Sequence, residues 1–137
     1  MDGVNVTSGS IVHDLTGKWV LGPGDASGMF GQLDNNGQID RAKLRTLDEL
    51  GGKIARPMEE MVPTVIRAGE IAGFLSEAGS TLLGGIPVGT PVGAPEGDQQ
   101  SVLVGAGVGE NELALSAGTS FSGSGCYVEV GGMRECR

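Results

Sequence analysis

Histidine and basic side chains are scarce in this chain of 137 residues. His13 is the single histidine, which excludes catalytic triads built on that residue and metal sites with several imidazole ligands. Lys and Arg number 9 against 17 Asp and Glu, giving a formal net charge of −8. Such a balance argues against a nucleic-acid partner, because a surface that binds nucleic acid needs clustered cations to displace counterions.

Long apolar runs are also missing, and cysteine is rare. No run approaches the roughly 20 apolar residues that cross a bilayer, and the N-terminus lacks the charged and apolar zones of a signal peptide. These absences predict a cytoplasmic protein without a membrane partner. The two cysteines, Cys126 and Cys136, stand near the C-terminus with no other sign of a secreted disulfide scaffold, so we expect free thiols.

Glycine, in contrast, is abundant, with 26 residues in the chain. Many of these glycines follow apolar runs, where a tight turn or the close approach of a ligand needs a residue without Cβ. The length is that of one ordinary domain, which can bury about two thirds of the surface that its unfolded chain exposes. The composition therefore favours a turn-dense α/β domain.

The clearest predicted helix follows a strong turn signal at residues 34–37. Asp40 is its expected N-cap, and Leu44, Leu47 and Leu50 lie on one helical face. Ser76 is the predicted cap of a second, short helix that ends before two glycines. The other predicted elements are a loop over residues 25–28, a bent strand or hairpin over 64–74, a buried strand over 87–94, a helix over 98–107 and a strand over 113–117. The acidic residues expected on the solvated surface are Asp34, Asp48, Glu49, Glu59 and Glu60.

The most informative stretch is APEGDQQ at residues 94–100, with the bend SAGTS at 116–120 after it. Asp98 stands at a predicted helix start, and the bend ends a predicted strand. In open α/β sheets, ligands bind outside the carboxyl ends of strands, where backbone N–H groups and helix N-termini attract anions. The order of these segments predicts chemistry on a small polar substrate.

Four segments carry a resemblance to a known family: GDASGMF at 24–30, PVGAPEGDQQ at 91–100, GAGVG at 105–109 and SAGTS at 116–120. In this order and spacing they resemble the FGGY family of carbohydrate kinases. The resemblance implies an incomplete α/β domain of the ribonuclease-H-like (actin-like ATPase) class. Residues 1–120 would be the C-terminal portion of that family's N-terminal domain, and 121–137 a divergent or truncated tail.

The resemblance implies ATP-dependent phosphorylation of a sugar hydroxyl, with a ketose of the xylulose or sedoheptulose type preferred. On the sugar side, Asp98 corresponds to the general base, and it also contacts the substrate. Gln99 takes the place of a substrate-binding glutamine. Asp25 and Ser27 correspond to positions near the sugar pocket.

On the nucleotide side, the resemblance implies ATP and Mg²⁺ as cofactors. Gly118 and Thr119 correspond to the turn that contacts the phosphates of ATP. Asp98 is the residue expected beside the metal ion, which bridges those phosphates.

Each of these residues also has a purely structural interpretation. Asp98 can serve as a helix cap, Gly118 and Thr119 as a turn between two strands, and Asp25 as a turn residue. The chain resembles neither the phosphate loop that opens these kinases nor their second domain, so we expect the isolated 137 residues to lack turnover. The alternative function is a non-catalytic sugar-binding or regulatory module, with self-association through an exposed sheet edge.

Overall fold

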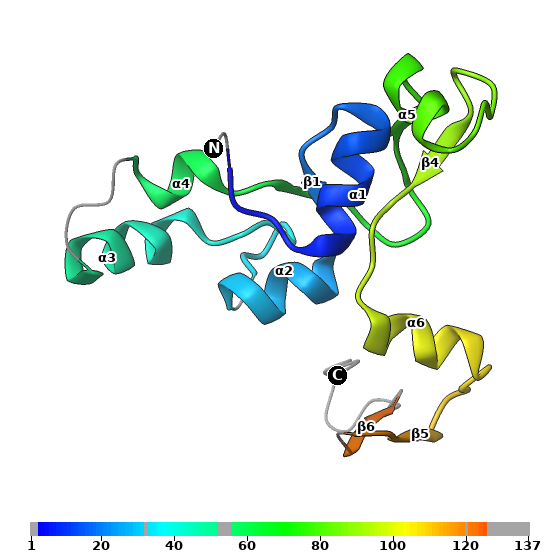
Figure 1. The fold of residues 1–137 in the computed structure, drawn as a ribbon. Coiled ribbons are helices and arrows are strands. Elements are labelled where there is room, and N and C mark those ends of the chain that lie inside the picture. The colour runs from blue at the N-terminus through cyan, green and yellow to red at the C-terminus, as the bar shows by residue number, and fades with distance from the viewer. Residues whose placement is uncertain (1–2, 32, 52–55, 120, 126–137) are drawn as a thin grey trace. The chain divides into compact units, whose positions relative to one another are not determined.

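The computed structural model describes residues 3–31, 33–51, 56–119 and 121–125 (Figure 1). The chain divides into two compact units, Met1–Glu96 and Gly97–Arg137. The predicted free thiols, Cys126 and Cys136, lie outside the described residues. So do most of the predicted tail and residue 120 of the SAGTS bend.

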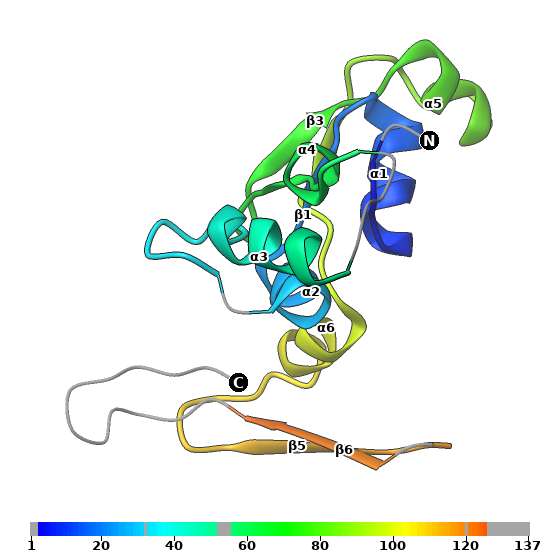
Figure 2. The same ribbon diagram turned by 90° about the vertical axis from the view of Figure 1, so that its left-hand side faces the viewer.

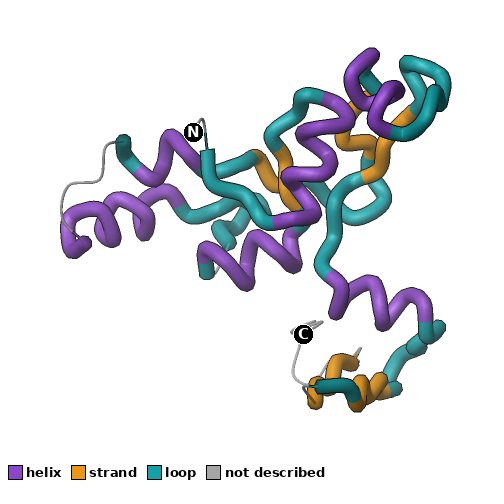
Figure 3. The backbone as a smooth tube through the Cα atoms, viewed as in Figure 1, coloured by secondary structure: helices purple, strands orange, loops and turns teal. Residues whose placement is uncertain are grey.

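The first unit is built of short helices interspersed with short strands (Figures 2 and 3). In chain order they are α1 (Thr7–Thr16), β1 (Val20–Leu21), α2 (Pro23–Phe30), α3 (Arg41–Gly51), α4 (Met58–Met61), β2 (Thr64–Val65), β3 (Ile71–Phe74), α5 (Glu77–Leu82) and β4 (Pro91–Gly93). The second unit contains α6 (Asp98–Gly105), β5 (Leu113–Ala117) and β6 (Phe121–Gly125). In the part of the chain that the structure describes, no helix combines the length and apolar character that a membrane span requires.

The described strands form three two-stranded sheets. β1 and β2 are parallel, whereas β3 pairs with β4 and β5 with β6 in antiparallel fashion. Parallel pairing brings the carboxyl ends of β1 and β2 to the same edge, although 42 residues separate Leu21 from the start of β2. The ribonuclease-H-like architecture stays a prediction.

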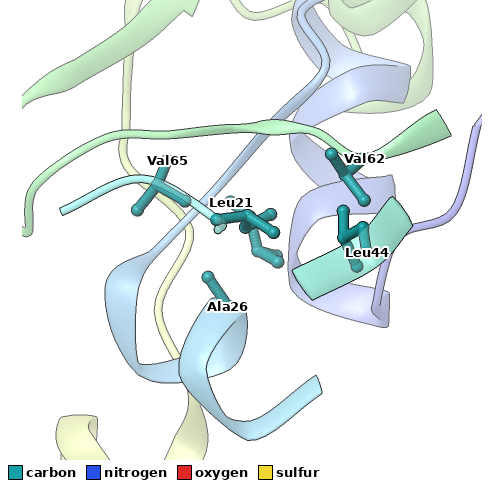
Figure 4. Close-up of a cluster of buried hydrophobic side chains, with 6 residues drawn as sticks. Leu21, Ala26, Leu44, Val62 and Val65 are labelled. Atoms are coloured by element: carbon teal, nitrogen blue, oxygen red, sulfur yellow. The ribbon is translucent and has the colours of Figure 1, made fainter. Parts of the chain in front are cut away.

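The main hydrophobic core lies around the β1–β2 pair (Figure 4). Its buried side chains come from both strands, from α2 and α3, and from the segments that flank them: Leu21, Ala26, Ile39, Leu44, Val62 and Val65. Leu21 and Leu44 are the largest fully buried side chains. Full burial of a leucine contributes about 1.5–3 kcal/mol, so these two residues anchor the first unit.

The loop predicted over residues 25–28 is wrong, because these residues form the middle of α2. Pro23 stands in the first turn, where its fixed φ favours a helix and its missing N–H costs nothing. Ala26 is fully buried in the core. Tertiary packing at this one position thus overrides the low helix propensity of the surrounding glycines.

The helix predicted after the 34–37 turn is confirmed as α3, and Asp40 is its cap. The Asp40 carboxylate accepts hydrogen bonds from the N–H groups of Ala42 (3.0 Å) and Lys43 (3.3 Å). The predicted apolar face is only partly used, since Leu44 is buried but Leu47 and Leu50 are 50% and 79% exposed.

Two of the acidic residues predicted to be merely solvated, Asp48 and Glu59, bind partners on a neighbouring helix. Asp48 Oδ2 accepts the backbone N–H of Met58 at 2.9 Å, and Glu59 forms an ion pair with Arg45 at 3.2 Å. Both contacts join α3 to α4, so the carboxylates hold the two helices together instead of only facing water.

The predicted strands at 64–74 and 87–94 are both interrupted. Residues 64–74 form two strands in different sheets, separated by a turn in which Gly69 has a φ of +83°. The second segment contributes only β4, whose Pro91 and Gly93 are exposed. Gly89, with a φ of +86°, keeps the residues before β4 out of a continuous strand.

Glycines also permit two close approaches of the chain within the first unit. A Cβ at Gly79 in α5 would lie 2.3 Å from the carbonyl oxygen of Leu15 in α1. Ser76 caps α5 as predicted, because its Oγ accepts the N–H of Gly79 at 3.0 Å. At the start of α2, a Cβ on Gly22 would lie 2.1 Å from the carbonyl oxygen of Pro95.

The contact at Gly79 yields a test of the packing between α1 and α5. Replacing Gly79→Ala should lower the free energy of unfolding by about 1–3 kcal/mol, because the added methyl group overlaps a backbone atom that cannot easily move. The matched control is Gly28→Ala in α2, where nothing lies within 4 Å and the better helix former should stabilise by about 0.5–1 kcal/mol. Urea denaturation measures both changes, and equal stability of the two variants would contradict the packing.

The cap of α3 predicts a pH dependence. The backbone N–H of Lys43 holds the pKa of Asp40 below its usual value of 3.8. The folded state therefore binds this proton less tightly than the unfolded state, and the resulting stability is present above pH 3.8 and lost as the pH falls through the lowered pKa. Asp40→Asn keeps a capping side chain but removes the titration.

Urea denaturation of both proteins between pH 7 and pH 2 measures this difference. The stability advantage of the wild type over Asp40→Asn should shrink in the acid range, because only the wild type loses the ionised cap. An advantage that stays constant across the range would contradict the assignment.

Candidate functional site

A cavity in the first unit lies where β1 and β2 both end. Pro23 closely follows the carboxyl end of β1, and Ile66 and Arg67 follow the carboxyl end of β2. Together with residues 35–38 and Glu70 they line a cavity of about 590 Å³. This is the edge at which open α/β sheets bind ligands.

One wall of the cavity is the turn at residues 34–38. Asp34 Oδ1 accepts the backbone N–H groups of Asn36 and Gln38, each at 2.8 Å. The side-chain amide of Gln38 then donates to the carbonyl of Val65 at 2.8 Å and accepts the N–H of Val65 at 3.0 Å. The Gln38 side chain therefore binds the turn to β2, and it makes the same pair of hydrogen bonds that the backbone of a neighbouring strand would make.

Another wall of the cavity is the turn that begins at Arg67. Glu70 Oε2 accepts the backbone N–H of Arg67 at 3.1 Å, and the N–H of Glu70 donates to the carbonyl of Arg67 at the same distance. Glu70 also accepts the N–H of Ala94 at 2.8 Å through its carbonyl. These bonds hold both residues in place, so the turn is fixed before any ligand arrives.

The polar groups left to face a ligand are those of Asn35, Asn36, Arg67 and Glu70. None of the ion pairs found among the described residues involves Arg67. The sequence prediction recognised the 34–37 turn but not this cavity. The turn pairs with β2 across 27 residues, and no local pattern reveals such a contact.

The predicted base, Asp98, is the first residue of α6 and is exposed. Gly97 occupies the N-cap position with an extended backbone, so the interpretation of Asp98 as the helix cap is wrong. Asp98 Oδ1 accepts the N–H of its neighbour Gln99 at 2.8 Å. The side chain thus stands at the helix N-terminus with the adjoining glutamine, also exposed, beside it.

Gly118 and Thr119 lie in the turn that joins β5 to β6, and both are exposed. The flanking pair is Ala117 with Phe121, so the turn is the end of an antiparallel hairpin. The structural interpretation of these residues as a turn between strands is confirmed. Their contact with a nucleotide stays a prediction.

Asp25 and Ser27 lie on α2 in the first unit and already have partners. Asp25 Oδ2 accepts the hydroxyl of Ser8 at 2.6 Å, and Ser27 donates to the carbonyl of Gly24 at 2.9 Å. The predicted site residues therefore fall into two groups. One group lies on α2, and the other lies on α6 and the β5–β6 turn.

The described residues contain no cluster of side chains that could hold a metal ion permanently. Within the described residues, no group of three or more His, Cys, Asp or Glu side chains could hold an ion. A metal brought by a substrate is a different case, since Mg²⁺ is commonly held by one or two carboxylates together with substrate phosphates.

The comparisons with known proteins point to sugar kinases. No model of a known protein family matches the chain. A segment of 59 residues is 42% identical to the L-fuculokinase of Escherichia coli K12, and to the same degree to the L-fuculokinase of Escherichia coli O157:H7. The match covers 43% of this chain and only 12% of each relative, so the chain corresponds to a small part of the length of these enzymes.

The hydrogen bonds between Gln38 and Val65 can be tested by measuring the free energy of unfolding. Gln38→Ala removes both bonds to Val65 and leaves two half-buried backbone groups without partners, so the free energy of unfolding should fall by about 1–3 kcal/mol. Gln99→Ala, which truncates an exposed glutamine, is the control and should change stability little. Equal denaturation midpoints for the two variants would show that the turn is not held by Gln38.

Proposed function

We propose that this chain is part of a carbohydrate kinase of the FGGY family, which transfers the γ-phosphate of ATP to a hydroxyl of a ketose. The observation that carries the proposal is the 59-residue similarity to L-fuculokinases. The four motifs between residues 24 and 120 also support it, because they resemble the family in order and spacing. We also propose the ribonuclease-H-like fold for the complete domain.

In this proposal Asp98 removes the proton from the attacking sugar hydroxyl. Its exposure supports the role, because a base must reach its substrate. Its position in the first turn of α6 supports it too, since the free N–H groups of a helix N-terminus favour a negative charge. Gln99 adjoins the base and would hydrogen-bond the sugar.

A single carboxylate fits the way in which Mg²⁺ accompanies nucleotides, and Asp98 would contact the ion that ATP brings. The bound ion would neutralise charge on the transferring phosphate. Gly118 and Thr119 would face the phosphates of ATP with backbone N–H and hydroxyl groups. Asp25 and Ser27 would support the sugar side, although their bonds to Ser8 and Gly24 limit them to indirect contacts.

The proposed substrate class is a ketose. The similar enzymes are named for L-fuculose, which is a ketose, and this agrees with the class predicted from the motifs. The narrower preference for xylulose- or sedoheptulose-like sugars stays a prediction, as does the cytoplasmic location.

A chimeric enzyme tests this function. Residues 1–119 of this chain would replace the equivalent segment of the Escherichia coli K12 L-fuculokinase, and ATP-dependent phosphorylation of L-fuculose would be measured. We expect an active chimera whose kcat falls by about 10²–10⁴-fold in the Asp98→Asn variant, because a positioned base contributes that factor.

Glu49→Gln in the same chimera is the matched control, because Glu49 is also an exposed carboxylate on a helix and lies outside the cavity lining. It should keep the parental kcat. A folded chimera in which Asp98→Asn and Glu49→Gln are equally active would contradict the role of Asp98. A folded chimera that binds L-fuculose without phosphorylating it would favour the non-catalytic module.

A further inference from the structure

We propose that the cavity at the carboxyl ends of β1 and β2 is a binding site for a neutral polyhydroxylated molecule, a sugar or a polyol. Its ligands would be Arg67, Glu70 and the side-chain amides of Asn35 and Asn36. This site differs from the one proposed around Asp98, and it does not depend on phosphoryl transfer.

The chemistry of the four side chains selects the class of ligand. Arginine only donates hydrogen bonds, an ionised glutamate only accepts them, and an asparagine amide does both. A sugar hydroxyl also donates and accepts, so a set of neighbouring hydroxyls can satisfy all four residues. The negative charge of Glu70 and the positive charge of Arg67 offset one another, so the cavity favours a ligand without net charge, and the two asparagine amides add partners for hydroxyl groups.

The dimensions agree with a small ligand. A cavity of about 590 Å³ falls within the range of about 300–1,000 Å³ that is typical of small-molecule sites. Pro23 and Ile66 contribute apolar surface, on which the C–H groups of a sugar can pack. The cavity is thus amphipathic in the same way as a sugar.

Both walls are fixed in advance. The turn at 34–38 is held by Asp34 and by the two bonds between Gln38 and Val65, and the Arg67 turn is closed by Glu70. A ligand would therefore order only the ends of the Asn35, Asn36 and Arg67 side chains. Binding to preorganised walls costs less conformational entropy than binding to free loops.

The test is an NMR titration of the isotope-labelled 137-residue chain with L-fuculose and with xylitol. We expect saturable shifts of the backbone N–H signals of residues 35–38 and 66–70. Arg67→Ala should weaken this binding by at least tenfold. Arg56→Ala is the matched control, because it removes another exposed arginine, whose ion pair with Glu60 lies away from the cavity lining.

A second variant tests the selection against anions. Glu70→Gln keeps an oxygen that can accept the N–H of Arg67 but removes the negative charge. We expect the wild type to bind L-fuculose at least tenfold more tightly than inorganic phosphate, and the variant to lose most of that preference. Stronger binding of phosphate than of L-fuculose by the wild type would overturn the proposal.

Asp98→Asn separates this proposal from the proposed kinase function. If the polyol binds in the cavity, Asp98→Asn leaves the shifts of residues 35–38 and 66–70 unchanged, whatever the activity of the chimera. Loss of sugar binding in Asp98→Asn but not in Arg67→Ala would place the sugar at Asp98 and overturn the cavity site. Absence of saturable shifts in the folded chain would also overturn it.

Discussion

The pair of hydrogen bonds between the Gln38 amide and the backbone of Val65 is the interaction on which the first unit depends most. β2 has only two residues, and its N–H and C=O groups pair with β1 on one side. Gln38 supplies the partner on the other side, at 2.8 and 3.0 Å. This single side chain therefore completes the sheet, positions the buried Val65 in the core and fixes one wall of the cavity.

The described residues divide the chemistry between two units. Amides, a guanidinium and a carboxylate of exposed residues gather beside the parallel strands of the first unit, where hydrogen bonds fix the two turns that carry them. Asp98 and Gln99 lie on α6 in the second unit, and both are exposed. No residue of α6 is buried. A cavity between preorganised turns suits recognition of a ligand, and the exposed place of Asp98 at a helix start agrees with the role of base proposed for it.

Local signals in the sequence predicted local structure well. Asp40 and Ser76 cap helices as expected, and the turn at 34–37 forms, because each feature depends on bonds within four residues. The prediction failed where distant packing decides, as in α2, which forms because Ala26 fills the core. The residues of the proposed kinase site could be named because their motifs resemble those of a known family. The cavity could not be predicted from the sequence, because its walls come from distant segments that meet only in the folded chain.

The close approach at Gly22 links two distant parts of the chain. The carbonyl of Pro95 occupies the space in which any other residue would place its β-carbon, at 2.1 Å. Positions 22 and 95 are therefore not free to vary independently: a larger residue at the first is tolerated only with a displaced backbone at the second. Because residue 95 closely follows β4 in the chain, a larger side chain beside β1 would displace the backbone that leaves β4, all within the first unit.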